Sequence, residues 1–392
     1  MSTQAQIVTD SQKVLIENYG RLPMAVVRGE IARLWDADGK EYLDFFAGFG
    51  AGGVGGHCHP VITAAIKAQA DTLLSHGNLL TSPPQVELAE KITAHGFGGK
   101  VFFCHSGAEA DEAALKLCRL AAGQGRYKII SFDGCFHGRT MGGLSLSPES
   151  FQAGFEPMLP GNVKVPYGDL DALSAAMDDE TAGVFVEPIQ GEGGLNVPTA
   201  EFMQGVRKLC SEAGILMVVD EVWTAPARTG KWFAYQHFGV EPDAMCLAKA
   251  IGGGAPVGAM VAAEGVADVL GPGTHGCTMG GNPLCAAAGA AAMRLIEDEN
   301  LVEAADTKGA KVVDMIESAN LSCVSDVRGK GLMVGMKLDD AKPAKDVMLA
   351  CLERGLILCI AKQNVVRIAP PLVTAEADIE KGVGILIDVL RG

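Results

Sequence analysis

Positive charge is scarce in this 392-residue chain, because 47 aspartate and glutamate residues outnumber 32 lysine and arginine residues and give a net charge of −15. Nucleic-acid phosphates and anionic membrane surfaces are bound by clusters of lysine and arginine. The chain also lacks any apolar run close to the roughly 20 residues of a membrane span. Its first ten residues are polar and lack the apolar stretch of a secretory signal. We therefore expect a cytoplasmic protein that binds neither nucleic acid nor membrane.

Cysteine pairs with CxxC spacing are absent, although the chain has 11 cysteines, an odd number. This usage fits reduced thiols better than a framework of disulfides. The three residues His57, Cys58 and His59 all have side chains that can bind a metal ion. Zinc sites usually combine such a group with a second one nearby, and the surrounding sequence has none. No metal is predicted.

Aromatic residues are also few, at 6% of the chain, whereas glycine reaches 50 residues, which indicates many tight loops. Short apolar runs alternate with helical stretches such as residues 60–74 and 84–94, as in a doubly wound α/β domain with a mostly parallel sheet. From about residue 290 the pattern changes to long helices, followed by expected strands over residues 327–338 and 355–370. We predict three parts: an N-terminal arm and small-domain segment over residues 1–50, a large α/β domain over residues 51–289, and a smaller α+β domain over residues 290–392.

Two apolar runs end at residues whose side chains can take part in catalysis. Residues 215–219 form an unbroken apolar run that ends at Asp220, and residues 244–248 form another that ends at Lys249, ahead of three glycines. Such runs are typical of strands buried in a parallel sheet, whose carboxyl ends bind ligands. Pyridoxal 5'-phosphate (PLP) needs an amine for its Schiff base and a carboxylate beside its ring nitrogen. The alternative is a capping aspartate and a solvated lysine.

A second candidate feature follows the predicted strand at residues 101–104. Ser106-Gly107-Ala108-Glu109 has the spacing of a capping box at the start of a helix. The free N–H groups of Gly107 and Ala108 are suited to a phosphate, although a well-capped helix alone explains the pattern equally well. Further along, Phe136-His137-Gly138-Arg139-Thr140 offers a ring to stack on a cofactor and a guanidinium for a carboxylate, or forms a plain surface loop.

A glycine loop gives a competing interpretation. Residues 48–53 match the G-x-G-x-x-G pattern of dinucleotide-binding folds, and Asp71 lies 18 residues beyond Gly53. In those folds a helix opens directly at the glycines, whereas helical periodicity here begins only at Pro60. We interpret the loop as a close-packed segment near a ligand, with a nicotinamide-dependent dehydrogenase as the alternative.

Together these motifs resemble the class III, or ornithine-type, aminotransferases of PLP fold type I, and among them the acetylornithine aminotransferases most. The resemblance covers nearly the whole chain, in the family's order. It is carried by these segments: residues 34–36, 39–44, 106–110, 136–140, 186–194, 220–222, 228–231, 248–250 and 273–283.

The resemblance implies the parts of a PLP site. Lys249 would bind the cofactor covalently, and Asp220 would pair with its ring nitrogen. Phe136 would stack on the ring, and Trp223 would lie beside its phenolic oxygen. The phosphate would be held by Gly107 and Ala108, together with Thr278 from the partner subunit of a homodimer.

The resemblance also implies how substrates are held. Arg139 would bind a carboxylate of the amino donor, and Arg367 would bind the α-carboxylate of glutamate. Glu192 would pair with Arg367, and Cys277 would touch substrate. The implied reaction moves the terminal amino group of N2-acetylornithine, or of a related ω-amino donor, to 2-oxoglutarate.

Four departures from the family pattern bear on the donor. Trp223 replaces a usual Gln, and residues 225–227 replace a Gly-x-Gly. Cys277 replaces a Ser, and Asp111 replaces an Asn. Other donors therefore stay open, namely ornithine, succinylornithine, 4-aminobutyrate or a diamine, as does a non-catalytic PLP-binding protein.

Overall fold

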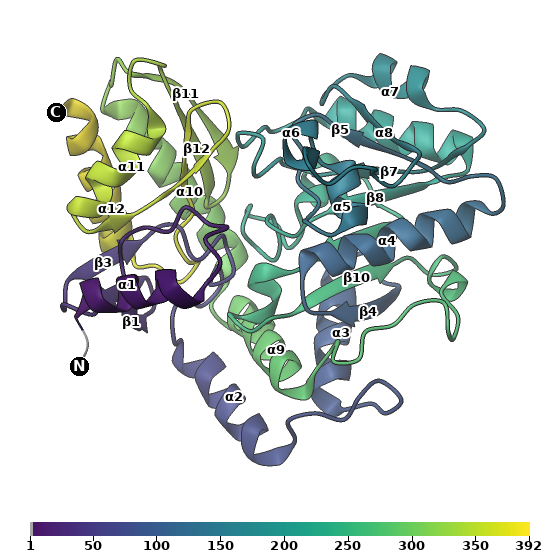
Figure 1. The fold of residues 1–392 in the computed structure, drawn as a ribbon, viewed down its shortest axis with the longest axis horizontal. Coiled ribbons are helices and arrows are strands. Elements are labelled where there is room, and N and C mark those ends of the chain that lie inside the picture. The colour runs from purple at the N-terminus through teal and green to yellow at the C-terminus, as the bar shows by residue number, and fades with distance from the viewer. Residues whose placement is uncertain (1–2) are drawn as a thin grey trace.

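The computed structural model describes residues 3–392, and its largest element is a seven-stranded sheet (Figure 1). One strand, β10, pairs antiparallel with both of its neighbours, and all other pairings in this sheet are parallel. The mostly parallel sheet that the sequence predicts is therefore confirmed. In spatial order the strands are β4 (Lys100–Cys104), β10 (Gly258–Ala262), β9 (Ala244–Leu247), β8 (Leu216–Asp220), β7 (Thr181–Val186), β5 (Lys128–Phe132) and β6 (Asn162–Val165).

The central strands are apolar because helices cover the sheet. All six residues of β7 are buried, as are the last four of β8. Helix α4 (Gly107–Ala122) crosses β7 to β10, and α8 (Ala200–Ala213) contacts β7 and β8. Apolar side chains on both faces of a strand are typical of this doubly wound arrangement.

Two smaller sheets lie beside the large one. Three N-terminal strands form antiparallel hairpins, β1 (Val26–Glu30), β2 (Arg33–Asp36) and β3 (Glu41–Asp44). The C-terminal strand β13 (Leu356–Ile357) joins this sheet in parallel with β3, so the purple N-terminal segment lies beside C-terminal elements in Figure 1. This pairing supports grouping residues 1–50 with the small domain; the domain boundaries themselves stay a prediction.

The C-terminal sheet corrects two strand predictions. Residues 327–338 form a hairpin of two strands, β11 (Val324–Lys330) and β12 (Met333–Leu338), because Gly331 adopts a φ of +53° and reverses the chain. Residues 355–370 contain β13 and the hairpin of β14 (Cys359–Ala361) with β15 (Val365–Ile368). The two turns fall at Gly329-Lys330-Gly331 and Lys362-Gln363-Asn364, polar and glycine breaks that the predicted continuous strands did not take into account.

The helices that the sequence predicts begin within one residue of their expected starts. The expected helices over residues 60–74 and 84–94 are α2 (Pro60–Thr72) and α3 (Pro83–His95). Within residues 3–392, no helix has the length and apolar character needed to cross a membrane. The remaining helices are α1 (Gln4–Val14), α5 (Met141–Leu146), α6 (Glu149–Gln152), α7 (Leu170–Ala176), α9 (Pro283–Asp298), α10 (Leu301–Ser318), α11 (Ala344–Glu353) and α12 (Glu376–Arg391), with short 3-10 turns η1 (Ala234–Phe238), η2 (Lys249–Gly252) and η3 (Ala267–Val269).

One glycine sets how closely α10 approaches the β11–β12 turn. A Cβ on Gly309 would lie 1.9 Å from the carbonyl oxygen of Gly331. We expect Gly309→Ala to lower the free energy of unfolding by about 1–3 kcal/mol, because a packed backbone must move. Gly384→Ala is the control: Gly384 lies in α12 with no atom within 4 Å of its added Cβ, and a helical alanine should gain about 0.5–1 kcal/mol. Urea unfolding measures both, and equal effects would contradict the packing argument.

Candidate active site

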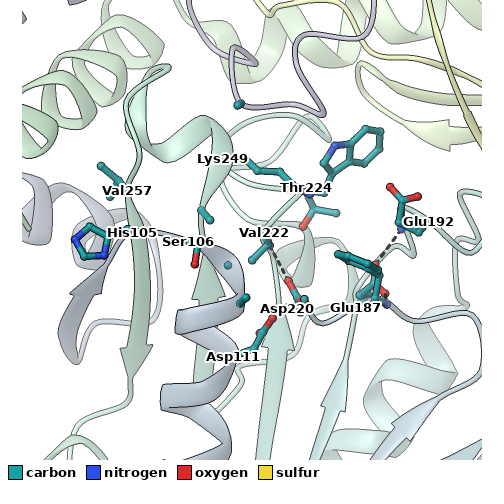
Figure 2. Close-up of a pocket in the computed structure, with 18 of the residues that line it drawn as sticks. His105, Ser106, Asp111, Glu187, Glu192, Asp220, Val222, Thr224, Lys249 and Val257 are labelled. Atoms are coloured by element: carbon teal, nitrogen blue, oxygen red, sulfur yellow. Dashed lines mark hydrogen bonds between the residues drawn. The ribbon is translucent and has the colours of Figure 1, made fainter. Parts of the chain in front are cut away.

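A cavity of about 530 Å³ opens at the carboxyl ends of the central strands (Figure 2). In Figure 2, Lys249 enters this cavity from the side opposite to Asp111 and Asp220. Eight of the residues that the sequence singles out line it: Gly107, Ala108, Phe136, Arg139, Glu192, Asp220, Trp223 and Lys249.

Asp220 is the last residue of β8 and is held in place by two hydrogen bonds. One oxygen, Oδ2, lies 2.8 Å from Nδ1 of His137, and Oδ1 accepts the N–H of Val222 at 2.9 Å. Asp220 is 5% exposed and His137 is fully buried. Burial alone would lower the pKa of the His137 imidazole, but Cys135 and Asp220 outweigh it and raise that pKa well above its ordinary value.

Two further buried acids surround Asp220. Burial and the charge of Asp220 raise the pKa of Asp111 well above its ordinary value, and its Oδ1 has no hydrogen-bond partner among the described residues. Burial, reinforced by Asp220, raises the pKa of Glu187 to about 7 although it accepts the N–H groups of Phe136 and Gly191. Because buried like charges repel, this wall of the cavity favours a cationic ligand atom.

Lys249 follows β9 at the start of the 3-10 turn η2, with a φ of +52°. Among residues 3–392 no carboxylate lies within ion-pair distance of its ammonium group, and Nζ is 6.0 Å from the centre of the Trp223 ring. Burial lowers the pKa of Lys249, and the nearby Arg367 adds to this, against the opposing effects of Asp220 and Glu192. A lower pKa increases the fraction of neutral amine, which is the nucleophilic and basic form.

The first turn of α4 supplies free backbone donors at the cavity. Ser106 caps the helix by accepting the N–H of Glu109 at 3.3 Å. The N–H groups of Gly107 and Ala108 precede the first intrahelical bonds, so they are available to an anion. A Cβ on Gly138 would lie 2.6 Å from Cβ of Ala108, so only glycine lets the neighbouring loop approach this turn.

Arg367 and Glu192 form an ion pair at the cavity margin. Nη1 of Arg367 lies 2.6 Å from Oε1 of Glu192, and the arginine is 2% exposed. Its guanidinium stacks 5.1 Å above the Trp223 ring. Arg139 is exposed, and its guanidinium lies 4.2 Å from the centre of the Phe151 ring and 5.4 Å from that of Phe136.

The glycine loop packs against Trp223. The indole N–H donates to the carbonyl oxygen of Phe49 at 2.6 Å, and a Cβ on Gly50 would lie 2.8 Å from the indole nitrogen. Residues 47–55 form turns, and the next helix after this loop begins only at Pro60. The loop therefore closes one end of the cavity and lacks the strand-to-helix geometry of a dinucleotide site.

Comparison with known proteins decides the family. Residues 15–390 match the family described as Aminotransferase class-III. This chain is a class-III aminotransferase. It is 45% identical to the acetylornithine aminotransferase of Caldanaerobacter subterraneus subsp. tengcongensis, over 98% of this chain and 99% of that protein. It is 46% identical to the acetylornithine aminotransferase of Methanopyrus kandleri, over 97% of each.

Solved structures agree with this assignment of the fold. The aminotransferase superposes on the ornithine aminotransferase of Toxoplasma gondii with a TM-score of 0.95 and 32% identity, covering 100% of this chain and 96% of that one. The acetylornithine aminotransferase of Elizabethkingia anophelis gives a TM-score of 0.88 and 33% identity, covering 100% of both chains. The predicted enzyme class is confirmed, and the dehydrogenase alternative is wrong.

Three of the predicted site residues of this aminotransferase lie elsewhere. Among the residues that the structure describes, Cys277, Thr278 and Arg367 are not part of the cavity lining. Arg367 lies behind the cavity wall, where it contacts the lining residues Gly191, Glu192 and Trp223. Sequence reasoning missed the contact of His137 with Asp220, although His137 lies within the Phe136–Thr140 motif. Glu187 directly follows β7, so it lies at the same edge of the sheet as Asp220, which ends β8.

The aminotransferase should also become less stable as pH rises, in part because of Glu221. This fully buried residue accepts the N–H of Tyr235 at 2.8 Å and the hydroxyl of Thr224, and burial raises its pKa to about 7. Between its unfolded pKa near 4.5 and about 7, the folded state binds more protons, so raising the pH through this window removes stability.

Glu221→Gln cannot ionise; its amide oxygen can accept the N–H of Tyr235, and its NH2 group can donate to the hydroxyl oxygen of Thr224. We expect the loss of unfolding free energy between pH 5 and pH 8 to shrink by up to about 3 kcal/mol, at about 1.4 kcal/mol for each unit of pKa shift. Urea unfolding of both proteins at the two pH values measures this difference. Parallel pH profiles would contradict the assignment.

Proposed function

We propose that this aminotransferase uses PLP to transfer the terminal amino group of N2-acetylornithine to 2-oxoglutarate. The observation that carries the chemistry is the meeting of Lys249 and Asp220 in one buried cavity. The identity of the donor is supported by curated acetylornithine aminotransferases that are 40–46% identical over nearly the whole chain.

The residues present fit PLP. The free N–H groups of Gly107 and Ala108 suit its phosphate, and Phe136 offers a ring face. The buried acids around Asp220 suit a positively charged ring nitrogen, and Lys249 offers the amine. When bound, PLP supplies an electron sink that stabilises the negative charge left by a departing proton.

The chain's own groups then handle the proton. The Nζ atom of Lys249, whose pKa is lowered by burial, would take a proton from the amine-bearing carbon of the donor and would give a proton to the corresponding carbon of the oxo acid in the second half-reaction. Nδ1 of His137 and the backbone N–H of Val222 hold the carboxylate of Asp220 in place. The buried walls around these groups exclude water, which strengthens their electrostatic interactions.

Two arginines allow one pocket to accept two unlike acids. Arg139 would hold a carboxylate of the acetylated donor. Arg367 would hold the α-carboxylate of glutamate, after Glu192 swings away from it. With the donor bound, Glu192 would neutralise Arg367, because an unpaired buried charge is costly.

We also propose a homodimer. Thr278 and Cys277 lie on the loop between η3 and α9 and outside the cavity of their own chain. That position supports a contact of Thr278 with the phosphate site of the partner subunit.

Single half-reactions test the donor. The PLP-loaded enzyme is mixed with one amino donor and no oxo acid, and the change in cofactor absorbance gives a rate. We expect N2-acetylornithine to react at least about tenfold faster than ornithine or 4-aminobutyrate, since pocket contacts with one extra group give about 10–200-fold discrimination. A faster reaction with ornithine or 4-aminobutyrate would overturn the proposed donor.

Lys249→Ala should lower turnover by at least about 10³-fold, as loss of a catalytic nucleophile does elsewhere. The cofactor should still bind through the other contacts. Borohydride treatment of wild type followed by peptide mapping should attach the cofactor to Lys249. The exposed Lys231 gives the control, since Lys231→Ala should keep activity. Attachment to any other lysine would contradict the assignment.

Glu192→Ala should separate the two half-reactions. Without Glu192, Arg367 is free for glutamate but uncompensated when the donor binds. We expect the ratio of the glutamate rate to the donor rate to rise about 10–100-fold, the equivalent of one charge-assisted hydrogen bond of about 1.5–3 kcal/mol. The exposed variant Glu241→Ala is the control. Equal losses in both half-reactions would mean that Glu192 only supports the fold.

Trp223→Gln should change donor preference more than cofactor affinity. The indole lies between Lys249 and Arg367, where it narrows the cavity. We expect the ranking of N2-acetylornithine, ornithine and 4-aminobutyrate to shift by about tenfold or more. An unchanged ranking would show that Trp223 only packs.

A further inference from the structure

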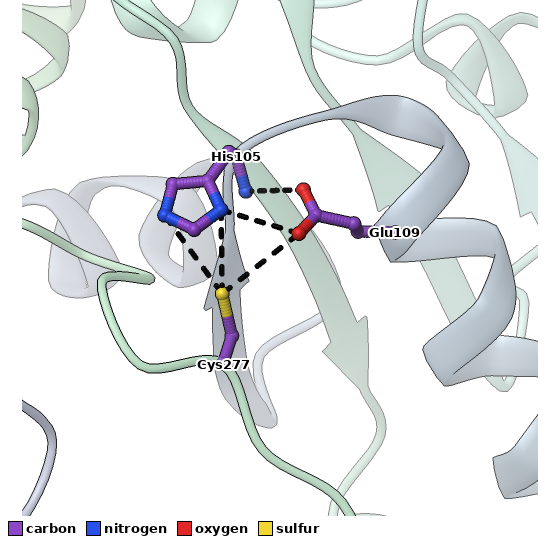
Figure 3. Close-up of side chains that lie close together, drawn as sticks. All are labelled: His105, Glu109 and Cys277. Atoms are coloured by element: carbon purple, nitrogen blue, oxygen red, sulfur yellow. Dashed lines mark hydrogen bonds and ion pairs between the residues drawn. The ribbon is translucent and has the colours of Figure 1, made fainter.

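Three side chains meet beside the start of α4, next to the cavity (Figure 3). His105 follows β4, Glu109 lies in the first turn of α4, and Cys277 comes from the loop between η3 and α9. Nδ1 of His105 lies 3.2 Å from Oε1 of Glu109 and 3.4 Å from Sγ of Cys277, and Sγ lies 4.0 Å from the same carboxylate oxygen.

These three distances approach the edges of a metal tetrahedron, and because Sγ of Cys277 also lies 3.9 Å from Nε2 of His105, the imidazole would rotate to direct one nitrogen at an ion. With zinc–sulfur bonds of about 2.3 Å and zinc–nitrogen or zinc–oxygen bonds of about 2.0–2.2 Å, tetrahedral angles place the ligand atoms about 3.3–3.6 Å apart. Two of the three edges observed here, at 3.2 and 3.4 Å, are within about 0.2 Å of that range; the third, at 4.0 Å, needs a shift of less than half an ångström. We propose that His105, Glu109 and Cys277 form a binding site for a borderline-soft divalent cation, with Zn²⁺ the best match.

The other oxygen of Glu109 fixes the carboxylate in this position. Oε2 accepts the N–H of His105 at 3.0 Å and the hydroxyl of Ser106 at 2.9 Å, which leaves Oε1 directed at the cluster. Such outer hydrogen bonds orient metal ligands in known sites.

The composition of the cluster indicates which ion it takes. Thiolate and imidazole ligands favour zinc over magnesium or calcium, which prefer oxygen alone. Three protein ligands leave a fourth position for water, as in sites where the ion exchanges. The side chains of His105 and Glu109 are 38% and 40% exposed, so an ion has access from solvent.

A bound ion would link two parts of the active site. The ion would link the loop that carries Cys277 and Thr278 to the first turn of α4, where Gly107 and Ala108 offer their N–H groups. The proposal does not depend on which amino donor the enzyme uses, because it rests on the positions of three side chains and on no contact with a donor.

Zinc binding by the PLP-loaded enzyme tests the site. The enzyme is titrated with Zn²⁺ in competition with a chromophoric chelator, and the bound ion is examined by X-ray absorption spectroscopy. We expect one tight equivalent per chain, with a single sulfur neighbour at about 2.3 Å and lighter neighbours at about 2.0–2.2 Å.

Variants assign the ligands. Cys277→Ser and His105→Ala should each weaken Zn²⁺ binding by at least about 100-fold, since the loss of even an outer hydrogen-bond partner costs about 10–100-fold. Cys323→Ser is the matched control, because Cys323 is likewise half-buried and lies outside the cluster. Circular dichroism checks that each variant is folded, and Glu109 is left intact because it belongs to the cap of α4.

Two results would overturn the proposal. One is Zn²⁺ binding that is equally tight in wild type and in Cys277→Ser. The other is a bound ion with only nitrogen and oxygen neighbours. Either would mean that the cluster is a hydrogen-bonded triad without a metal.

Discussion

The hydrogen bond between Asp220 and His137 connects the fold to the chemistry of this aminotransferase. Strand β8 delivers Asp220 to the edge of the sheet, and the buried imidazole holds one carboxylate oxygen at 2.8 Å. The backbone of Val222 holds the other. These two hydrogen bonds hold the carboxylate in a position where it would pair with a cationic ring nitrogen.

The acids around Asp220 favour a cationic ligand atom in the cavity. Asp111 and Glu187 both have raised pKa values, because burial and Asp220 disfavour their ionised forms. Burial also lowers the pKa of Lys249, which favours its reactive neutral amine. Burial therefore disfavours the charged form of all three side chains.

Local signals in the sequence predicted much of this site. Asp220 and Lys249 each follow an apolar run; β8 ends at Asp220, and β9 ends at Leu247, two residues before Lys249. The cap at Ser106 is also local, because its partners lie within three or four residues. Physical rules that act over a few residues are readable from one chain.

Contacts between distant segments were harder to predict. His137 meets Asp220 across 83 residues, and nothing in the spacing reveals that this histidine turns inward. The two hairpin turns in the C-terminal sheet were missed although both interrupt the apolar pattern, and the positive φ values of Gly331, Gln363 and Asn364 mark the reversals. The placement of Trp223 between Lys249 and Arg367 likewise depends on tertiary packing.

The most direct test of this account is the protonation state of the ring nitrogen of PLP bound to the enzyme, measured by nitrogen-15 magnetic resonance with labelled cofactor. The account predicts a protonated nitrogen at neutral pH, because Asp220 and the surrounding acids favour positive charge there. An unprotonated ring nitrogen in the wild-type enzyme would contradict the central role of Asp220.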